Sequence, residues 1–351
     1  MDNYFQNRDI ENTKKLSALR KQLPPYCGMY FVAISSVTTA LTRLGYARDL
    51  LIFFNYLSST GQFGTCTPPE FDIDRLNAVT QSDIEAYLDY LSNYEVDGKI
   101  YVNKLSAMSR KLSAVRSLFK YLYNKDLLHE NVSAKVLTPK LHEKEIIRLE
   151  SDEMQRFMDV VERGDNLGEG HQSAYHKNVA LRDMAITTLL LGTGIRISEC
   201  VGLNVDDVDF DNRKFVVTRK GGSRSILYMP QEVIDALQAY LSVRLAIPTD
   251  TDALFLSLQN KRINVRTVQI MVRKYAAAAV PTKHITPHKL RSTFGTNLYR
   301  ETKDIYVVAT VLGHSDVNTT KKHYAAISED IKKQAAEVVR LRPSDGDDTH
   351  E

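Results

Sequence analysis

The sequence predicts a mainly helical chain of two domains, the second of which also carries a small β-hairpin. Hydrophobic residues recur at helical spacing along most of the chain, and only one pair of short β-like runs is joined by a glycine-rich turn. A length of 351 residues is typical of two or three domains. With 43% hydrophobic and 25% charged residues, the composition is globular and excludes wholesale disorder.

Three amphipathic segments predict a helical bundle in residues 1–140. In each, apolar residues recur every three or four positions, which places them on one face of a helix. The segments are 35–61, which Gly61 ends, a second that opens at Thr80, and 106–123.

A linker is expected after this bundle. The stretch 124–145 is polar, contains Pro139 and keeps no clear period, so we place the linker at 141–147. The second domain, 148–341, is predicted to be mixed α/β and mostly helical. An acidic tail, 342–351, has the composition of a disordered segment.

The second domain contains a short series of distinct elements. It begins with an amphipathic helix that we expect Ser151 to cap. A polar insert with glycines, 162–176, is predicted to be a surface loop, and a buried helix then ends at Gly194. Two β-like runs, 214–218 and 224–230, predict a hairpin.

Several protein classes are excluded by simple features. No apolar run is long enough for a transmembrane helix, and the first residues lack the apolar region of a secretory signal. Three widely spaced cysteines argue against a disulfide framework or a cysteine-rich zinc site: Cys27, Cys66 and Cys200. We therefore expect a cytoplasmic protein with no membrane partner.

Local charge is more informative than the net charge of +3. Residues 101–125 and 253–300 contain six and nine Lys or Arg residues respectively, and neither run contains an acid. Such runs favour a face that binds a polyanion. The basic residues that we expect to contact such a polyanion are Lys104, Arg110, Lys111, Arg219, Arg224, Arg262 and Lys289.

Two patterns before and within the hairpin could bind or protonate a phosphate. Arg196 follows a Thr-Gly turn at the start of a helix, where a guanidinium and backbone N–H groups can face one anion. Glu199 lies three residues further on and could hold the arginine in place. Lys220 lies in the glycine-rich hairpin turn, from which it could donate a proton to a phosphodiester.

Two further patterns lie near the end of the chain. Thr286 and Pro287 predict a helix start that places His288 and Arg291 together on the first turn. An imidazole and a guanidinium at a helix N-terminus can bind a phosphate. His314 follows a helix-ending glycine, and Tyr324 lies beside several cations that would help its phenol to lose a proton.

Metal chemistry is less well supported by the sequence. His171 and His176 in the insert lack a third ligand. The alternating carboxylates Asp207, Asp209 and Asp211 could hold a cation, which would favour a metal-dependent nuclease, but they more simply form a surface turn before the hairpin.

Taken in order, these residues resemble the tyrosine recombinase (phage integrase) family over nearly the whole chain. The likeness is strongest in LLLGTGIRISECVGLNVDDVD, TPHKLRSTFGTNL and LGHSDVNTTKKHYA. It implies a helical SAM-like core-binding domain followed by a catalytic domain that breaks and rejoins DNA. It is closest to Xer-like members, which lack an arm-binding domain.

The resemblance implies a role for each residue. Tyr324 would attack the scissile phosphate and form a 3′-phosphotyrosyl link. Arg196 and Arg291 would clamp the phosphate, His314 would donate a further hydrogen bond to it, and Glu199 would support Arg196. Lys220 would protonate the leaving 5′-oxygen, and His288 would assist proton transfer at the tyrosine. No metal, ATP or other cofactor is expected.

The resemblance also implies partners. Two domains would clamp a duplex that contains a specific site, and four subunits would exchange their C-terminal helices and pass through a Holliday junction. Integration or excision of a mobile element and resolution of DNA dimers are both consistent with this reading, with or without a directionality factor or partner recombinase. The alternatives are a DNA-binding regulator that keeps only the fold and a type IB topoisomerase-like enzyme.

Overall fold

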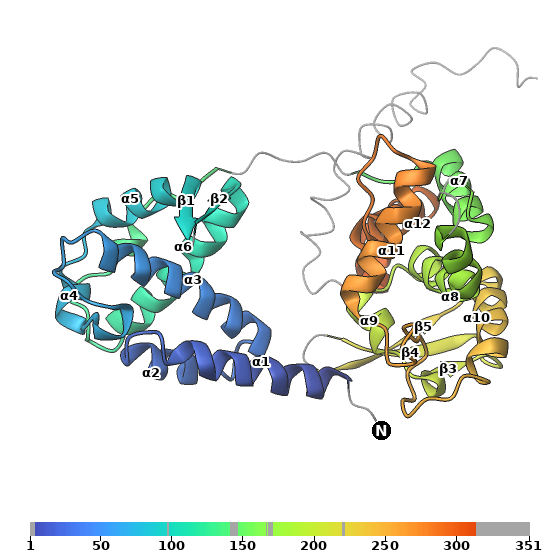
Figure 1. Cartoon of the computed structure of the whole chain (residues 1–351), viewed down its shortest axis with the longest axis horizontal. Coiled ribbons are helices and arrows are strands. Elements are labelled where there is room, and N and C mark those ends of the chain that lie inside the picture. Colours follow the sequence, from blue (N-terminus) through green and yellow to red (C-terminus); the bar gives the residue numbers. More distant parts are fainter. Residues whose placement is uncertain are drawn as a thin grey trace, which may run out of the picture. The chain divides into compact units, whose positions relative to one another are not determined.

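The computed structural model describes residues 4–96, 98–140, 147–165, 167, 171–219 and 222–313. Its contacts divide the chain into two compact units, Asn3–Lys144 and Glu145–Glu351 (Figure 1). The division falls in the segment where a polar, aperiodic sequence predicted a linker.

The first unit is a helical bundle with one small hairpin. Three of its helices, α3, α5 and α6, are those that the hydrophobic period predicted, and side chains of Thr39 and Thr80 cap the first two. The elements are α1 (Tyr4–Arg20), α2 (Tyr26–Ala33), α3 (Ala40–Ser59), α4 (Ile73–Asn77), α5 (Gln81–Ser92), β1 (Asn93–Val96), β2 (Lys99–Val102) and α6 (Leu105–Tyr123).

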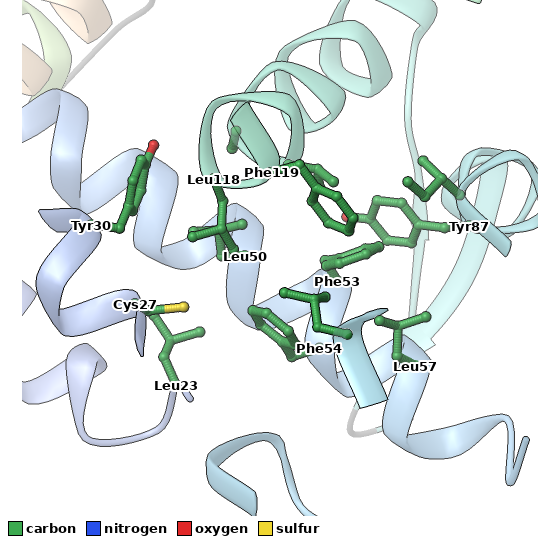
Figure 2. Packing of buried hydrophobic residues seen from close by; sticks show 14 of the residues in the cluster. Leu23, Cys27, Tyr30, Leu50, Phe53, Phe54, Leu57, Tyr87, Leu118 and Phe119 are labelled. Carbon is green, nitrogen blue, oxygen red and sulfur yellow. The ribbon is translucent and has the colours of Figure 1, made fainter. Parts of the chain in front are cut away.

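The core of this unit is built on the apolar face of α3. Phe53 packs edge-on against Tyr87 of α5 and against Phe119 of α6, with ring centroids 5.0 and 6.2 Å apart (Figure 2). All three rings are fully buried, and Leu50 and Leu118 join them from α3 and α6. Burial of such large apolar side chains is the main source of the stability of the bundle.

The hairpin β1–β2 was not predicted from the sequence. Its strands pair antiparallel, with Tyr94 opposite Tyr101, and these two rings stack with centroids 5.4 Å apart. Gly98 adopts a φ of +73° in the turn, a conformation that glycine reaches without strain. The Asp-Gly pair before the second strand was therefore an available hairpin signal.

The first part of the polar, aperiodic stretch 124–145 belongs to this unit. Leu128 and Val136 are buried in its core. Arg116 of α6 holds the segment by donating hydrogen bonds to the backbone carbonyls of Ser133 and Val136. The first half of this stretch is therefore packed on the bundle despite its polar sequence, and the linker at 141–147 stays a prediction.

The second unit is mixed α/β, with helices around a three-stranded antiparallel sheet (Figure 1). The central helix α8 packs against α7, α9, α10 and α12. The elements are α7 (Ser151–Arg163), α8 (His171–Thr193), α9 (Ile197–Gly202), β3 (Val208–Asp209), β4 (Lys214–Thr218), β5 (Arg224–Tyr228), α10 (Gln231–Arg244), α11 (Val265–Ala279), α12 (Pro287–Thr302) and α13 (Ile305–Leu312).

Two local predictions in this unit need correction. Ser151 is the first helical residue of α7, and the N-cap is Glu150, whose backbone N–H donates to Glu153 Oε2 at 2.8 Å. The insert 162–176 is not wholly a loop, because α8 already begins at His171. The hairpin β4–β5 is confirmed, with Phe215 and Val217 facing the core on alternate positions.

Candidate active site

The junction between α8 and α9 fixes Arg196 from two sides. Gly194 ends α8 with a φ of +62°, and Arg196 is the N-cap of α9. The buried carboxylate of Glu199 accepts from Arg196 twice, from the backbone N–H and from Nη1, each at 2.9 Å. The predicted support of Arg196 by Glu199 is therefore present in the geometry, while the guanidinium remains 38% exposed.

The N-terminus of α12 provides a second arginine. Thr286 is the N-cap and Pro287 the first helical residue, as predicted. Arg291, on the first turn, is only 5% exposed and donates from Nη1 to the carbonyl of Gly194. His288, one turn before Arg291, is exposed to solvent.

Both arginines meet a third at the C-terminus of α13. Arg196 Nη2 donates to the carbonyl of Gly313 at 3.0 Å, and Arg291 Nη2 donates to the carbonyl of Leu312. Arg219 Nη1 shares that Leu312 carbonyl at 3.0 Å. The last carbonyls of a helix lack partners within the helix and carry a partial negative charge, so they attract cations.

A cleft of about 570 Å³ borders this cluster. It lies between the end of α8, strand β5 and helices α12 and α13. Arg219 and Gly313 form part of its wall, together with Phe294 of α12 and Tyr228 of β5. The arginine cluster therefore borders a cleft formed by the described residues.

Three of the predicted catalytic residues lie outside the described residues: Lys220, His314 and Tyr324. Two of them are chain neighbours of the cluster, since Lys220 follows Arg219 and His314 follows Gly313. The structure therefore brings Arg196, Glu199 and Arg291 together. The catalytic roles of these residues, of His288 and of the three outside the described residues stay predictions.

Two of the basic residues predicted to contact DNA have interior partners instead. Arg262 has a side chain only 9% exposed and donates to the carbonyls of Val201 and Leu203. Lys111 is buried, and its ammonium donates to Asn103 Oδ1 at 3.0 Å. Burial lowers the pKa of Lys111, as the neighbouring Arg110 also does, while Asp49 acts in the opposite direction. We therefore correct both to structural residues.

The other basic candidates are accessible to different degrees. Arg110 forms a two-point ion pair with the buried Asp49 of α3 but keeps a side chain 54% exposed. Lys104 and Arg224 are exposed, and Lys289 is half-buried. Arg219 faces the end of α13, a position that sequence reasoning did not foresee.

The carboxylates before the hairpin have structural roles. Asp209 accepts from the backbone N–H of Asn212 at 3.0 Å and pairs with Lys214, while Asp207 accepts from the backbone N–H of Asn204. Among the described residues, no group of three or more His, Cys, Asp or Glu side chains could hold a metal ion. The hydrogen bonds of Asp207 and Asp209 agree with the interpretation of these carboxylates as a surface turn.

Two of the three cysteines lack the exposure and the low pKa of a nucleophile. Cys27 and Cys200 are buried, and burial raises the pKa of both thiols, so they stay protonated.

In the part of the chain that the structure describes, no helix is long and apolar enough to cross a membrane.

Comparison with known proteins adds an independent line of evidence. The profile of the phage integrase family matches residues 147–330, and that of the phage integrase N-terminal SAM-like domain matches residues 30–126. These matches fall in the second and first unit respectively.

Named relatives cover most of the chain. The tyrosine recombinase XerC of Caldanaerobacter subterraneus subsp. tengcongensis is 34% identical over 80% of this chain and 76% of that protein. The tyrosine recombinase XerS of Streptococcus gordonii is 31% identical over 92% of this chain and 97% of that protein.

A solved structure shows the same fold. A crystal structure of the XerH site-specific recombinase in a post-cleavage complex with a palindromic difH substrate matches with a TM-score of 0.64. The match has 18% sequence identity and covers 85% of this chain and 80% of that chain. The family matches and the relatives that cover most of the chain, together with this fold, show that the chain belongs to the phage integrase family of tyrosine recombinases and is a site-specific DNA recombinase.

Proposed function

We propose that the chain cuts and rejoins duplex DNA through a covalent 3′-phosphotyrosyl intermediate formed on Tyr324. The observation that best supports this is the convergence of Arg196 and Arg291 on the carbonyl end of α13, directly before His314 in the chain. Two guanidiniums that already face a partial negative charge are suited to bind the non-bridging oxygens of one phosphate.

The reaction exchanges one phosphodiester bond for another. The oxygen of Tyr324 forms a bond to phosphorus as the bond between phosphorus and the 5′-oxygen breaks. His288 accepts the phenol proton, and Lys220 gives a proton to the leaving 5′-oxygen. Attack by a 5′-hydroxyl of the second duplex reverses these steps, so rejoining needs no ATP.

The arginines and His314 would act on the charge that develops at phosphorus. Hydrogen-bond donors aimed at the non-bridging oxygens stabilise the transition state more than the ground state, since negative charge accumulates there during attack. Glu199 keeps Arg196 in the required orientation through its two hydrogen bonds. These cationic groups supply the stabilisation that a metal ion gives in other phosphoryl-transfer enzymes.

The two units would have separate roles. We assign 1–140 to binding of the duplex and 148–341 to the chemistry, with Lys104 and Arg110 in the first unit contacting phosphates. Assembly as a tetramer on two sites, with a Holliday junction between two rounds of exchange, would unite two duplexes. Mobile-element integration or excision and dimer resolution both use this reaction.

A suicide duplex tests the proposal. A site is first selected from a random-sequence duplex library by binding to the purified chain, and a nick is then placed near the cleavage position. The chain should form a covalent adduct with this DNA in excess EDTA, and Tyr324→Phe should bind the DNA without forming it. Adduct formation by Tyr324→Phe would refute the nucleophile. Binding by the unaltered chain without any adduct would favour a DNA-binding regulator.

A further inference from the structure

Arg219 joins the β4–β5 hairpin to the C-terminus of α13. Its side chain leaves the end of β4 and donates from Nη1 to the Leu312 carbonyl at 3.0 Å, with Nη2 at 3.5 Å from the Val311 carbonyl. The contact spans more than ninety residues of sequence. It is the hairpin's side-chain link to the helix that precedes His314.

The contact requires close approach to a glycine. A Cβ atom built on Gly313 would lie 1.3 Å from Arg219 Nη1, so no other residue leaves room for the guanidinium in this position. Gly313 also has a φ of +62°, which favours glycine at the end of a helix. The space beside α13 is therefore matched to this one arginine.

The orientation of the Arg219 side chain does not fit a residue whose only role is to contact DNA. Its Nε is buried and finds no acceptor among the described residues, and its Nη atoms are turned to backbone carbonyls. A buried donor without a partner costs free energy, so the two carbonyl contacts must outweigh that cost. The arginine shares the Leu312 carbonyl with Arg291, which brings it into the phosphate-binding cluster.

We propose that Arg219 is a positioning residue that acts through its chain neighbour Lys220. By tying the end of β4 to the carbonyl end of α13, it holds the backbone of Arg219, to which Lys220 is joined in the chain, next to Arg196 and Arg291, and so supports protonation of the leaving 5′-oxygen by Lys220. This inference rests on the proposed function, because it assigns Arg219 to the step in which that oxygen is protonated. Displacement of a catalytic group by about 1 Å can lower a rate by about 100-fold.

A substrate whose leaving group needs no proton separates this role from a purely structural one. Replacing the 5′-bridging oxygen with sulfur gives a thiolate leaving group, which departs without a general acid because a thiol has a much lower pKa than an alcohol. We expect Arg219→Ala to slow single-turnover cleavage of the ordinary suicide duplex by about 10- to 100-fold. On the sulfur-containing duplex the variant should fall within about threefold of the unaltered chain, since the proton donor is no longer needed.

Lys214→Ala is the matched control. It removes a cation from the same strand, whose ion pair is with Asp209 rather than with α13, and it should cleave both duplexes at the rate of the unaltered chain. Arg219→Lys keeps the charge but presents one ammonium in place of the fork, so its defect should be intermediate and also relieved by sulfur.

Gly313→Ala should displace the guanidinium and reproduce the defect of Arg219→Ala. In the double variant Arg219→Ala/Gly313→Ala, the substitution at Gly313 should slow cleavage less than it does on its own, because the arginine side chain that it would displace is already absent. This comparison also covers the case in which Arg219→Ala folds poorly, which thermal unfolding would reveal.

Three results would overturn the inference. One is an Arg219→Ala defect of the same size on both duplexes. Another is unaltered cleavage with weaker DNA binding and a smaller salt dependence, which would make Arg219 a phosphate contact. The third is full activity of Arg219→Ala on the ordinary duplex. Failure of the unaltered chain to form any adduct would instead refute the proposed function, and the two failures are thus distinguishable.

Discussion

Glu199→Gln is the sharpest test of how Arg196, which we propose binds the phosphate, is held. The substitution keeps the shape of the side chain but replaces one acceptor oxygen with an NH₂ group. In the unaltered chain the Glu199 carboxylate is 3% exposed. It accepts hydrogen bonds from the backbone N–H of Arg196 and from Arg196 Nη1, each at 2.9 Å. In the glutamine variant, one of these donors must face another donor.

The expected magnitude follows from this lost hydrogen bond. A hydrogen bond to a charged group contributes about 1.5–3 kcal/mol. If the loss falls entirely on the orientation of Arg196 in the transition state, it corresponds to a rate lower by about 10- to 150-fold. Any part that falls on folding will appear as a lower melting temperature. DNA affinity should change little, because the guanidinium keeps its charge and its hydrogen bond to Gly313.

Single-turnover cleavage of the suicide duplex, with protein in excess, measures this directly. Glu232→Gln, on the exposed face of α10, is the matched control and should cleave at the rate of the unaltered chain. Cleavage by Glu199→Gln within about twofold of the unaltered chain, with the same melting temperature, would show that the carboxylate does not hold Arg196 for catalysis.

Three further predictions concern stability. Tyr87→Phe should leave the melting temperature unchanged or raise it, because the buried Tyr87 hydroxyl has no hydrogen-bond partner among the described residues. Gly194→Ala should lower the free energy of unfolding by about 1–3 kcal/mol, because the backbone has a φ of +62° and the new Cβ would lie 2.3 Å from Phe294 Cδ1; an unchanged urea midpoint would contradict this. Burial alone would raise the pKa of Glu150, but hydrogen bonds and charge from Arg148 and Arg300 outweigh it and hold the pKa below its ordinary value. The stabilisation is therefore present near pH 7 and lost as the pH falls through the folded-state pKa, so in urea titrations Glu150→Gln should be less stable than the unaltered chain at pH 7, and this difference should disappear as the pH falls through that pKa.

The sequence was most informative where the signal is local. Helical periods predicted α3, α5 and α6, and the Thr-Pro pair predicted the start of α12. Glu199 was correctly paired with Arg196, since three residues separate them in one helical turn.

Contacts between distant segments could not be predicted in this way. Lys111 and Arg262 look like surface cations in the sequence, because no acid lies close to either of them in an acid-free run. The partners of the arginine are carbonyls about sixty residues away. The partner of the lysine, Asn103, is eight residues away but lies before the start of α6, so the helical period does not place it beside Lys111. The partners of Arg219 could not be predicted for the same reason, since they lie at the end of α13.

A neutral phosphate analogue tests most directly whether Arg196 binds the scissile phosphate. A methylphosphonate at the mapped cleavage position replaces a charged non-bridging oxygen with a methyl group. A guanidinium that neutralises that oxygen then no longer stabilises the transition state. The rate penalty of Arg196→Ala relative to the unaltered chain should be at least about tenfold smaller on this duplex than on the ordinary one, when both are measured in a single turnover. Equal penalties on the two duplexes would show that Arg196 acts away from the reacting phosphate.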